Sequence, residues 1–267
     1  MTDPLVRYDV AAGVATATLD SPHNRNALSS RLIEELVAAL TAAAADERAR
    51  VIVVTHTGPV FCSGADLKET AAAFASGDLP AGRMGEVLAA IWEHPKPVLA
   101  RVGGPARAGG LGIIAAADVA VCSTDVTFAF TEVRLGVIPA VISATVLARL
   151  SPRAAAELFL TGEQFDGARA AQIGLVTVAV AADELDATVA ATASSLVRGA
   201  PAALAATKAL LRGDLPATGP RPSIRDRLAA LGEVSVGFFT SDEGREGVLS
   251  FVEKRDPSWI PPGMTTR

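Results

Sequence analysis

Two segments of the chain place small residues where a strand is expected to pass into a loop and then into a helix. The first reads FCSGADLKE from Phe61 to Glu69, and the second reads GGPARAGGLGIIAAAD from Gly103 to Asp118. Glycine and alanine let a ligand approach the backbone closely. Free N–H groups at the start of a helix can donate hydrogen bonds, and the helix dipole favours negative charge there. Two such groups aimed at one oxygen would form an oxyanion hole, although the spacing alone leaves open that both segments are only tight turns.

The sequence lacks the local motifs of several other kinds of site. It contains no HExxH zinc motif, no GxSxG nucleophile elbow and no GxxxxGK(S/T) phosphate loop, and its glycine-rich turn does not fit GxGxxG. Cys62 and Ser63 have no evident activating base, so loop and core positions are the better interpretation for them. His56 ends an expected strand and His94 lies in an expected loop, and structural or surface roles are favoured for these two and for His23. We therefore expect no metal site.

The elements that must position the two segments alternate between strands and helices. Ser29 or Ser30 can cap a helix whose apolar residues recur at helical spacing, and a second helix is expected over Met84–Trp92. Strand, helix, strand units of this kind predict an α/β fold with a parallel sheet and right-handed crossovers. The expected strands are Val14–Leu19, Val51–Thr55, Val98–Val102 and Val119–Cys122.

The strand pattern ends at about Asp183, and the rest of the chain is expected to be helical. The segment Gly213–Pro222 holds three prolines and two glycines, which is typical of a linker. The sequence thus predicts an α/β body followed by a helical tail. The expected helices of the tail span 183–197, 200–211, 223–239 and 243–254.

Length and composition are those of a globular protein. The chain has 267 residues, 50% of them hydrophobic and 20% charged, with a formal net charge of −5. This length allows a full-sized core, and the mild acidity argues against nucleic acid or an anionic membrane as a partner. The longest uncharged apolar stretch, Leu135–Ala148, is too short to span a bilayer. Cys62 and Cys122 form no CxxC pair and no signal peptide is evident over Met1–Tyr8, so a cytoplasmic location is expected.

Several short blocks, besides the two small-residue segments, match the pattern of a known family in order and spacing. They are NRNALS at 24–29, HPKPV at 94–98, FTEVRLGVIP at 130–139, LTGEQF at 160–165, AAQIGLV at 170–176 and EKRDP at 253–257. With these blocks the chain resembles the enoyl-CoA hydratase/isomerase (crotonase) superfamily along nearly its whole length. The resemblance implies a crotonase-like spiral core of ββα turns over residues 1–195 and a helical C-terminal trimerisation region over residues 196–267. The assemblies that it implies are a homotrimer or a dimer of trimers.

The resemblance also implies a chemistry, which is stabilisation of the enolate of an acyl-CoA thioester. By position, the N–H groups of Ala65 and Gly109 match the two oxyanion donors, and the thioester carbonyl oxygen would accept both bonds. No separate cofactor is implied, because coenzyme A enters as part of the substrate. The positions that match substrate-binding and coenzyme A-binding residues are Arg25, Ala27, Gly64, Asp66, Leu67, Lys68, Gly110 and Lys254.

The chain departs from the family pattern at one acid/base position. The standard hydratase uses two glutamates; the second is present as Glu132, whereas Gly112 stands in the place of the first. Hydration needs a base for water and an acid for the α-carbon, which two carboxyl groups can share. Glu132 could do both through one water held with the help of the Ala140 N–H, or it could shuttle one proton between carbons, as in the Δ3,Δ2-enoyl-CoA isomerases. Alternatively Glu86 or Asp66 replaces the missing acid, although capping of the next helix is the favoured role for Asp66.

The segment TEVRLGVIPAVIS, from Thr131 to Ser143, resembles bacterial methylglutaconyl-CoA and isohexenylglutaconyl-CoA hydratases, in which glycine also occurs at the Gly112 position. A second substrate carboxylate would then meet Arg107 or Arg134, for which an exposed loop cation and a structural salt bridge are the respective alternatives. We therefore predict an enoyl-CoA hydratase that adds water across the 2,3 double bond of a 2-enoyl-CoA, with branched and methylglutaconyl-like esters among the candidates. A Δ3,Δ2-enoyl-CoA isomerase and a non-catalytic acyl-CoA-binding protein are the alternatives.

Overall fold

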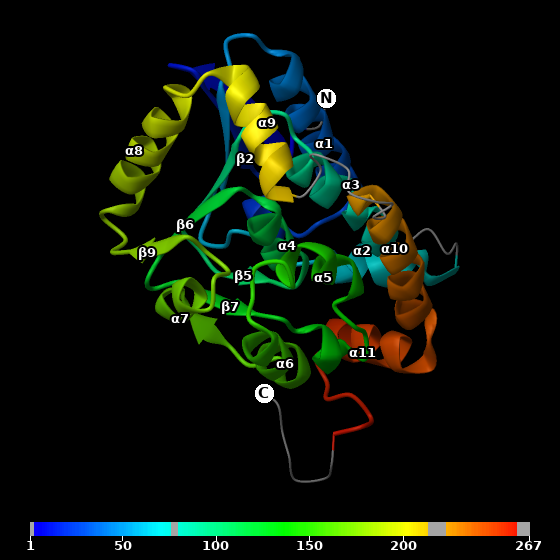
Figure 1. Ribbon diagram of the computed structural model, residues 1–267. Helices are drawn as coiled ribbons and strands as arrows, with labels where there is room; N and C mark the ends of the chain where they lie inside the picture. The colour runs from blue at the N-terminus through cyan, green and yellow to red at the C-terminus, as the bar shows by residue number, and fades with distance from the viewer. Residues whose placement is uncertain (1–2, 76–79, 213–222, 261–267) are drawn as a thin grey trace.

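The computed structural model describes residues 3–75, 80–212 and 223–260 of the chain. Within them, the main sheet contains β1 (Val6–Ala11), β2 (Val14–Leu19), β3 (Val51–His56), β4 (Val98–Val102), β6 (Val119–Ser123) and β9 (Val178–Val180). Their order in the sheet is β1-β2-β3-β4-β6-β9 (Figure 1). The β1–β2 hairpin is antiparallel, and every other neighbouring pair is parallel.

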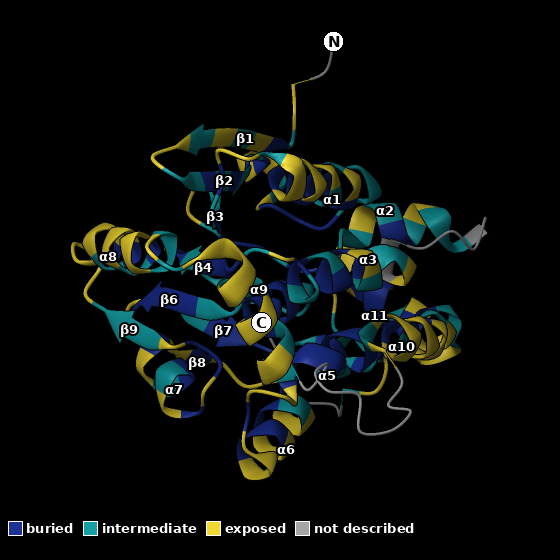
Figure 2. Cartoon of the chain, turned by 45° about the horizontal axis from the view of Figure 1, so that its top comes forward, coloured by how far each residue is buried: buried dark blue, intermediate teal, exposed yellow. Residues whose placement is uncertain are grey.

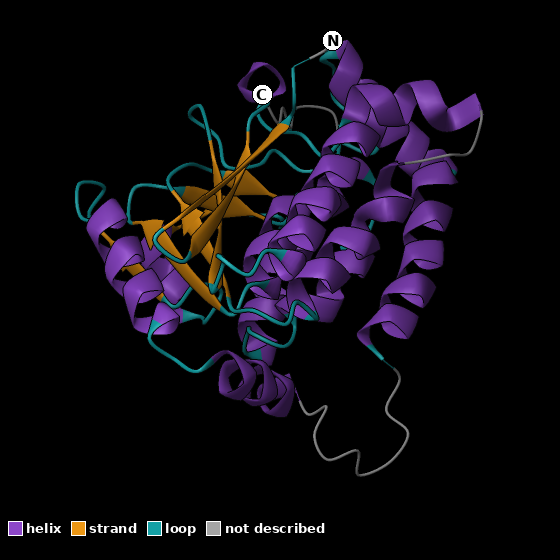
Figure 3. Ribbon diagram, turned by 90° about the horizontal axis from the view of Figure 1, so that it is seen from above, coloured by secondary structure: helices purple, strands orange, loops and turns teal. Residues whose placement is uncertain are grey.

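Helices lie on both sides of this sheet (Figure 3). They are α1 (Ser30–Ala45), α2 (Leu67–Ala72), α3 (Pro80–Trp92), α4 (Gly109–Ala116), α5 (Ala140–Val146), α6 (Pro152–Thr161), α7 (Gly167–Gln172), α8 (Leu185–Val197), α9 (Pro201–Arg212), α10 (Ile224–Thr240) and α11 (Asp242–Glu253), with 3-10 turns η1 (Pro22–Asn24), η2 (Ala73–Ala75) and η3 (Glu132–Leu135). On one face, Leu185 and Val189 of α8 pack against Val53, Leu99 and Val121 of the sheet. The opposite face packs against α1, α3 and α4 in a larger apolar core.

The four strands predicted from the sequence are present as β2, β3, β4 and β6, and they are parallel as expected. The predicted helices of the tail are present as α8, α9, α10 and α11. The expected linker Gly213–Pro222 lies outside the described residues. The structure adds β1, β9 and a second sheet of very short strands. β9 and the strands of the second sheet have only two or three residues each. Such strands are too short to show an alternating pattern, so the sequence did not indicate them.

The second sheet has the order β5-β7-β8, formed by β5 (Ala106–Arg107), β7 (Thr127–Ala129) and β8 (Phe165–Asp166). Ala106 pairs with Phe128 in the parallel β5–β7 ladder. A further parallel bridge joins Cys62 to Ala106. The loop after β3, the strand before α4 and the strand before η3 are therefore held side by side.

The C-terminal helices pack onto the body as well as carrying exposed surface. α10 lies against α3 and α5, and α11 lies against α2 and η3. Figure 2 shows α5 and the sheet strand β6 largely buried, whereas α8 and α10 carry exposed outer turns. α8 ends at Val197 on the sheet, so it belongs with the body; the division at residues 195 and 196 stays a prediction. No described helix is long and apolar enough to cross a membrane alone, and α8 and α9 pass that test only as a pair bent by 107°.

A buried ion pair fastens α9 to the body. Lys208 Nζ lies 2.6 Å from Asp118 Oδ2, and it also donates to the carbonyl oxygens of Ile91 and Lys96. The same Asp118 oxygen accepts the N–H of Val98 at the start of β4, at 2.8 Å. The Lys208 side chain is only 6% exposed, and burial lowers its pKa. The pair therefore links a tail helix to the first residue of a central strand.

We expect Lys208→Met to lower the free energy of unfolding, because it leaves a partly buried carboxylate without its cation. Removing one partner of a fully buried pair costs roughly 3–5 kcal/mol. The Asp118 side chain is 27% exposed, so we expect a loss of about 2 kcal/mol, measured by urea denaturation. Arg225→Met is the matched control, because it breaks an exposed pair with Glu93. Equal losses in the two variants would contradict a special role for the buried pair.

Candidate active site

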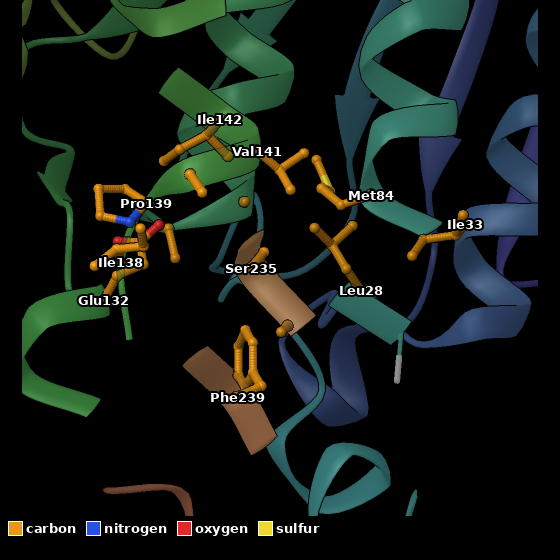
Figure 4. A pocket seen from close by; sticks show the side chains of 14 residues that line it. Leu28, Ile33, Met84, Glu132, Ile138, Pro139, Val141, Ile142, Ser235 and Phe239 are labelled. Atoms are coloured by element: carbon orange, nitrogen blue, oxygen red, sulfur yellow. The ribbon is translucent and has the colours of Figure 1, made fainter. Parts of the chain in front are cut away.

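Three neighbouring backbone segments bring the predicted catalytic positions together. A few residues beyond the bridged Cys62, Ala106 and Phe128, the chain reaches Ala65, Gly109 and Glu132. All three line one cavity, together with Ala140. Figure 4 shows Glu132 among the side chains around this cavity. The cavity holds about 490 Å³ of space between protein atoms, part of it open to solvent. Its apolar wall includes Leu28, Ile33, Met84, Val141, Ile142 and Phe239.

Two backbone N–H groups at this cavity have no hydrogen-bond partner among the described residues. Leu28 N–H donates to Gly64 O at 2.8 Å and Asp66 N–H donates to Leu28 O at 3.3 Å, so this bridge leaves out the N–H of Ala65. Gly109 is the first residue of α4, where N–H groups lack a partner within the helix. Both groups can therefore donate to an oxygen in the cavity. The dipole of α4 favours negative charge on that oxygen.

The residue before Gly109 has an uncommon backbone conformation. Ala108 has φ +46° and ψ −115°, outside the regions that residues with a side chain adopt readily. Its own N–H donates to Ala129 O of β7 at 3.1 Å, which holds the turn to the second sheet. A non-glycine residue in such a conformation costs on the order of 1–3 kcal/mol. The turn fixes the direction of the peptide plane that carries the Gly109 N–H.

Glu132 is a buried acid with an unsatisfied oxygen. It is the first residue of η3, its exposed fraction is 8%, and its Oε2 has no hydrogen-bond partner. Removal from water raises its pKa to about 7, while a backbone hydrogen bond acts in the opposite direction. A carboxyl group with a pKa close to neutral can both take up and return a proton at that pH.

The turn that carries Glu132 is braced by the tail. Val137 N–H donates to Glu132 O at 3.1 Å, and the turn ends at Gly136 with φ +66°. A Cβ atom at Gly136 would lie 2.5 Å from the carbonyl oxygen of Glu243 in α11, so only glycine allows this approach. α11 is thus packed directly against the backbone that positions the acid.

Packing excludes a second carboxylate at position 112. A Cβ atom at Gly112 would lie 2.6 Å from Ile142 Cγ2 and 3.3 Å from Leu88 Cδ2. The Thr145 hydroxyl reaches Gly112 O at 3.3 Å, which ties α5 to α4 at the same place. Ile142 of α5 therefore fills the space that a side chain at 112 would need. Among the described residues that line the cavity, Glu132 is the one acid.

Neither Asp66 nor Glu86 is placed to act as the acid that is missing at position 112. Asp66 caps α2, as predicted, because its Oδ1 accepts the N–H groups of Lys68 and Glu69 at 3.1 Å each. Glu86 is half exposed, pairs with Arg83 and does not line the cavity. The expectation that either acid replaces the first glutamate is not supported by these positions.

Ala140 lies where the sequence predicted it, but its N–H is already in use. This N–H donates to Ile138 O at 2.8 Å, because the chain closes a tight turn through Pro139 before α5 begins. The expectation that it holds a water molecule is therefore wrong for this conformation. The residue contributes its methyl group to the cavity wall instead.

Two predicted coenzyme A-binding cations lie on adjacent segments. Arg25 O accepts the N–H of Ser63 at 3.1 Å, which joins the turn after η1 to the loop before α2. The side chains of Arg25 and Lys68 are exposed. Two cations on neighbouring segments beside the cavity suit a phosphate-bearing handle. Lys254 is exposed as well and ends α11 in the left-handed conformation, with φ +58°.

The remaining predicted substrate-binding positions are largely structural. Ala27, Gly64 and Gly110 are buried. Gly110 packs closely on the loop before α2, since a Cβ atom there would lie 2.9 Å from Cys62 Cβ. Leu67 packs with Phe239 and other apolar residues of the tail. These residues hold the two turns together, and any contact with a ligand at the glycines is through the backbone.

The two arginines considered for a second substrate carboxylate are engaged elsewhere. Arg107 is half-buried and donates to Thr127 O and Thr127 Oγ1 at 2.6 and 2.9 Å, so the exposed loop cation expected there is wrong. Arg134 forms the predicted salt bridge, to Glu163 at 2.7 Å. Neither residue lines the cavity.

Cys62 is fully buried, and burial raises its pKa to about 12, so it is a core thiol and no nucleophile.

Sequence reasoning missed the contribution of α10. Ser235 and Phe239 lie one helical turn apart and both line the cavity (Figure 4). The tail was predicted to serve in trimer formation, and nothing in its sequence marks these two residues. They line the same cavity as Glu132 only because α10 packs against α3 and α5.

The matches with known proteins extend over almost the whole chain. The enoyl-CoA hydratase/isomerase family model matches residues 9–261. The crystal structure of an enoyl-CoA hydratase from Mycobacterium avium is 43% identical, covers 97% of this chain and 100% of its own, and has a TM-score of 0.84. A "Probable enoyl-CoA hydratase" of Rhodobacter capsulatus is 35% identical over 94% of this chain and 96% of its own length. The mouse "Enoyl-CoA hydratase domain-containing protein 3, mitochondrial" is 32% identical over 92% of this chain and 81% of its own length.

These matches span both the turns around Ala65 and Gly109 and the segment of Glu132. The mixed α/β architecture with several C-terminal helices is that of the crotonase fold. The chain therefore belongs to the enoyl-CoA hydratase/isomerase family.

Proposed function

We propose that the protein is an enoyl-CoA hydratase that uses Glu132 as its single acid/base. The observation that carries the proposal is the arrangement of one cavity. It combines the free N–H groups of Ala65 and Gly109 with a buried carboxyl group whose pKa is about 7 and whose Oε2 has no partner. Such a set can hold negative charge on one oxygen and move a proton nearby.

In the proposed reaction, the thioester carbonyl oxygen accepts both N–H groups. The Glu132 carboxylate removes a proton from water while the water oxygen bonds to C3 of the 2-enoyl group. The electron pair of the double bond moves to the thioester, which becomes an enolate held by Ala65 and Gly109. Protonated Glu132 then returns its proton to C2, which gives a 3-hydroxyacyl-CoA. One carboxyl group thus serves first as base and then as acid.

A Δ3,Δ2-enoyl-CoA isomerase is the second candidate, and the packing at position 112 favours it. In this reaction Glu132 takes a proton from C2 of a 3-enoyl-CoA and returns it to C4, with the same enolate in between. The step needs no bound water. It therefore suits a cavity in which Ile142 fills the space at Gly112 and the Ala140 N–H is already bonded.

The lining supports an uncharged, largely apolar acyl group. Among the described residues around the cavity there is no lysine or arginine. An unpaired carboxylate is costly to bury, so a methylglutaconyl-like acid is disfavoured here. The bulky wall formed by Ile33, Met84 and Val141 instead suits an aliphatic chain, including a branched one.

A homotrimer or a dimer of trimers remains our proposal for the assembly. Exposed apolar side chains on the tail helices, Leu211, Phe238 and Phe251 among them, support it. Contact between subunits would remove such side chains from water.

We expect Glu132→Gln to abolish most turnover while the protein stays folded. General acid–base catalysis contributes roughly 100- to 10,000-fold, so kcat with crotonyl-CoA should fall within that range. The measurement is steady-state hydration followed by loss of enoyl absorbance. Glu86→Gln, an exposed acid outside the cavity, is the control and should leave kcat unchanged. Unchanged turnover in Glu132→Gln would remove Glu132 from the mechanism.

The pH dependence of stability should differ between wild type and Glu132→Gln. The folded-state pKa of about 7 is above the ordinary value of 4.5, so ionisation of Glu132 destabilises the fold as pH rises between these values. The glutamine variant lacks this penalty. We expect it to match wild type near pH 4.5 and to exceed it above pH 7, by at most roughly 3 kcal/mol. Parallel curves of free energy of unfolding against pH would show that Glu132 is not a desolvated acid.

Product identity separates the two candidate reactions. A panel of 2-enoyl-CoA and 3-enoyl-CoA esters is incubated in water labelled with heavy oxygen and analysed by mass spectrometry. The hydratase proposal expects labelled 3-hydroxyacyl-CoA from 2-enoyl esters. Conversion of 3-enoyl to 2-enoyl esters with no heavy oxygen incorporated would favour the isomerase. Tight binding of all esters without any product would point to a non-catalytic acyl-CoA-binding protein.

A further inference from the structure

Ser235 is a buried hydroxyl in an otherwise apolar part of the cavity. It lies on α10, its exposed fraction is 6%, and Phe239 one turn later lines the same cavity. Apart from Glu132, it is the one lining residue with a polar side chain among the described residues. The mechanism proposed above gives it no role.

The hydroxyl of Ser235 makes no hydrogen bond with any residue in 3–75, 80–212 or 223–260. Hydroxyls on nearby helices behave differently. Thr240 of the same helix donates to Val236 O at 2.9 Å, and the buried Ser250 of α11 donates to Gly247 O at 2.9 Å. The usual bond of a helical serine or threonine back to the preceding turn is therefore not used by Ser235.

An unpartnered hydroxyl in a buried apolar setting is unfavourable for folding. At Ser235, which is 6% exposed, the hydroxyl keeps little contact with water and gains no bond to the protein in return. Alanine at this position would avoid that loss at no cost in packing volume. A serine whose hydroxyl faces a ligand cavity meets solvent when the cavity is empty and a group of the ligand when it is filled.

The packing of α10 fixes where this hydroxyl lies. A Cβ atom at Gly85 of α3 would lie 3.4 Å from Leu228 Cβ, and one at Gly82 would lie 3.5 Å from Val236 Cγ2. At these distances a Cβ atom would make an ordinary contact, so α10 lies directly against α3 near Leu228 and near Val236, the residue after Ser235. The hydroxyl is therefore held at the cavity by a rigid helix and not by a loop.

The charges around the cavity select the kind of partner. No described lining residue is a cation, and Glu132 carries a proton for part of the time at neutral pH because its pKa is about 7. A charged group would be poorly compensated there. An uncharged oxygen, which can both donate and accept, fits the hydroxyl.

We propose that Ser235 is a substrate-positioning residue whose hydroxyl binds an uncharged hydroxyl oxygen of the bound acyl group. The proposal rests on the acyl-CoA site proposed above and adds a recognition element to it. The oxygen can have two sources. It is either the water-derived oxygen at C3, which becomes the 3-hydroxyl of the product, or a hydroxyl carried further along the acyl chain.

Binding of saturated esters tests this without relying on turnover. Dissociation constants are measured by calorimetry for hexanoyl-CoA and for its 3-hydroxy, 4-hydroxy and 5-hydroxy derivatives, with the 3-hydroxy ester also measured in Glu132→Gln to prevent dehydration. We expect at least one hydroxy ester to bind about three- to tenfold more tightly than hexanoyl-CoA, as one neutral hydrogen bond provides. Ser235→Ala should remove this preference and leave the affinity for hexanoyl-CoA unchanged or higher. The position of the preferred hydroxyl identifies the source of the oxygen.

Three controls keep the outcome clear. Ser235→Thr retains the hydroxyl and should retain the preference. Ser250→Ala makes the same chemical change at a buried serine away from the cavity, and it should lower the melting temperature without altering the preference, whereas Ser235→Ala should not lower it. If hexanoyl-CoA binds but no hydroxy ester is preferred, or if Ser235→Ala weakens all four esters equally, the role of Ser235 is wrong and the acyl-CoA site stands. If no ester binds, both proposals fail.

Discussion

The bridge from Cys62 to Ala106 and the ladder from Ala106 to Phe128 hold three chain segments in one register, and the candidate site depends on that register. The pairs themselves contain no catalytic group. Each of the three segments leaves the register through a short turn, and the turns meet at the same cavity. A slip of one segment by a residue would turn its side chains to the opposite face and separate the N–H donors from the acid. The shortest strands of the fold thus determine the distances between the N–H donors and the acid.

Burial explains both what the site contains and what it lacks. Ile142 and the neighbouring apolar residues leave no room for a carboxylate at Gly112. The same removal of water raises the pKa of Glu132 into the neutral range. A single acid with that pKa can both remove a proton and return one. In the standard hydratase, two carboxyl groups divide these two transfers between them. In the proposed hydratase mechanism, the apolar packing that raises this pKa lets one carboxyl group do the work of two.

Sequence patterns predicted the central parallel strands and the helices of the tail. The strands Val51–His56 and Val98–Val102 are long and apolar enough to be seen directly. The site positions came from a resemblance and not from periodicity. Contacts between distant segments could not be predicted. Ser235 reaches the cavity only through the packing of α10 on α3, and the Ala140 N–H is used by a local turn that propensities do not reveal.

The contact between Gly112 and Ile142 also restricts how this sequence can change. A glutamate at position 112 would collide with Ile142, whereas a smaller residue at 142 alone would leave a hole beside Leu88 and gain nothing chemical. Each single substitution is therefore harmful, and only the two together could build a second acid. The two positions are therefore coupled through packing, and glutamate at position 112 should be tolerated better with a small residue at position 142 than with isoleucine. A packing contact between two residues thus determines how many acids this cavity can hold.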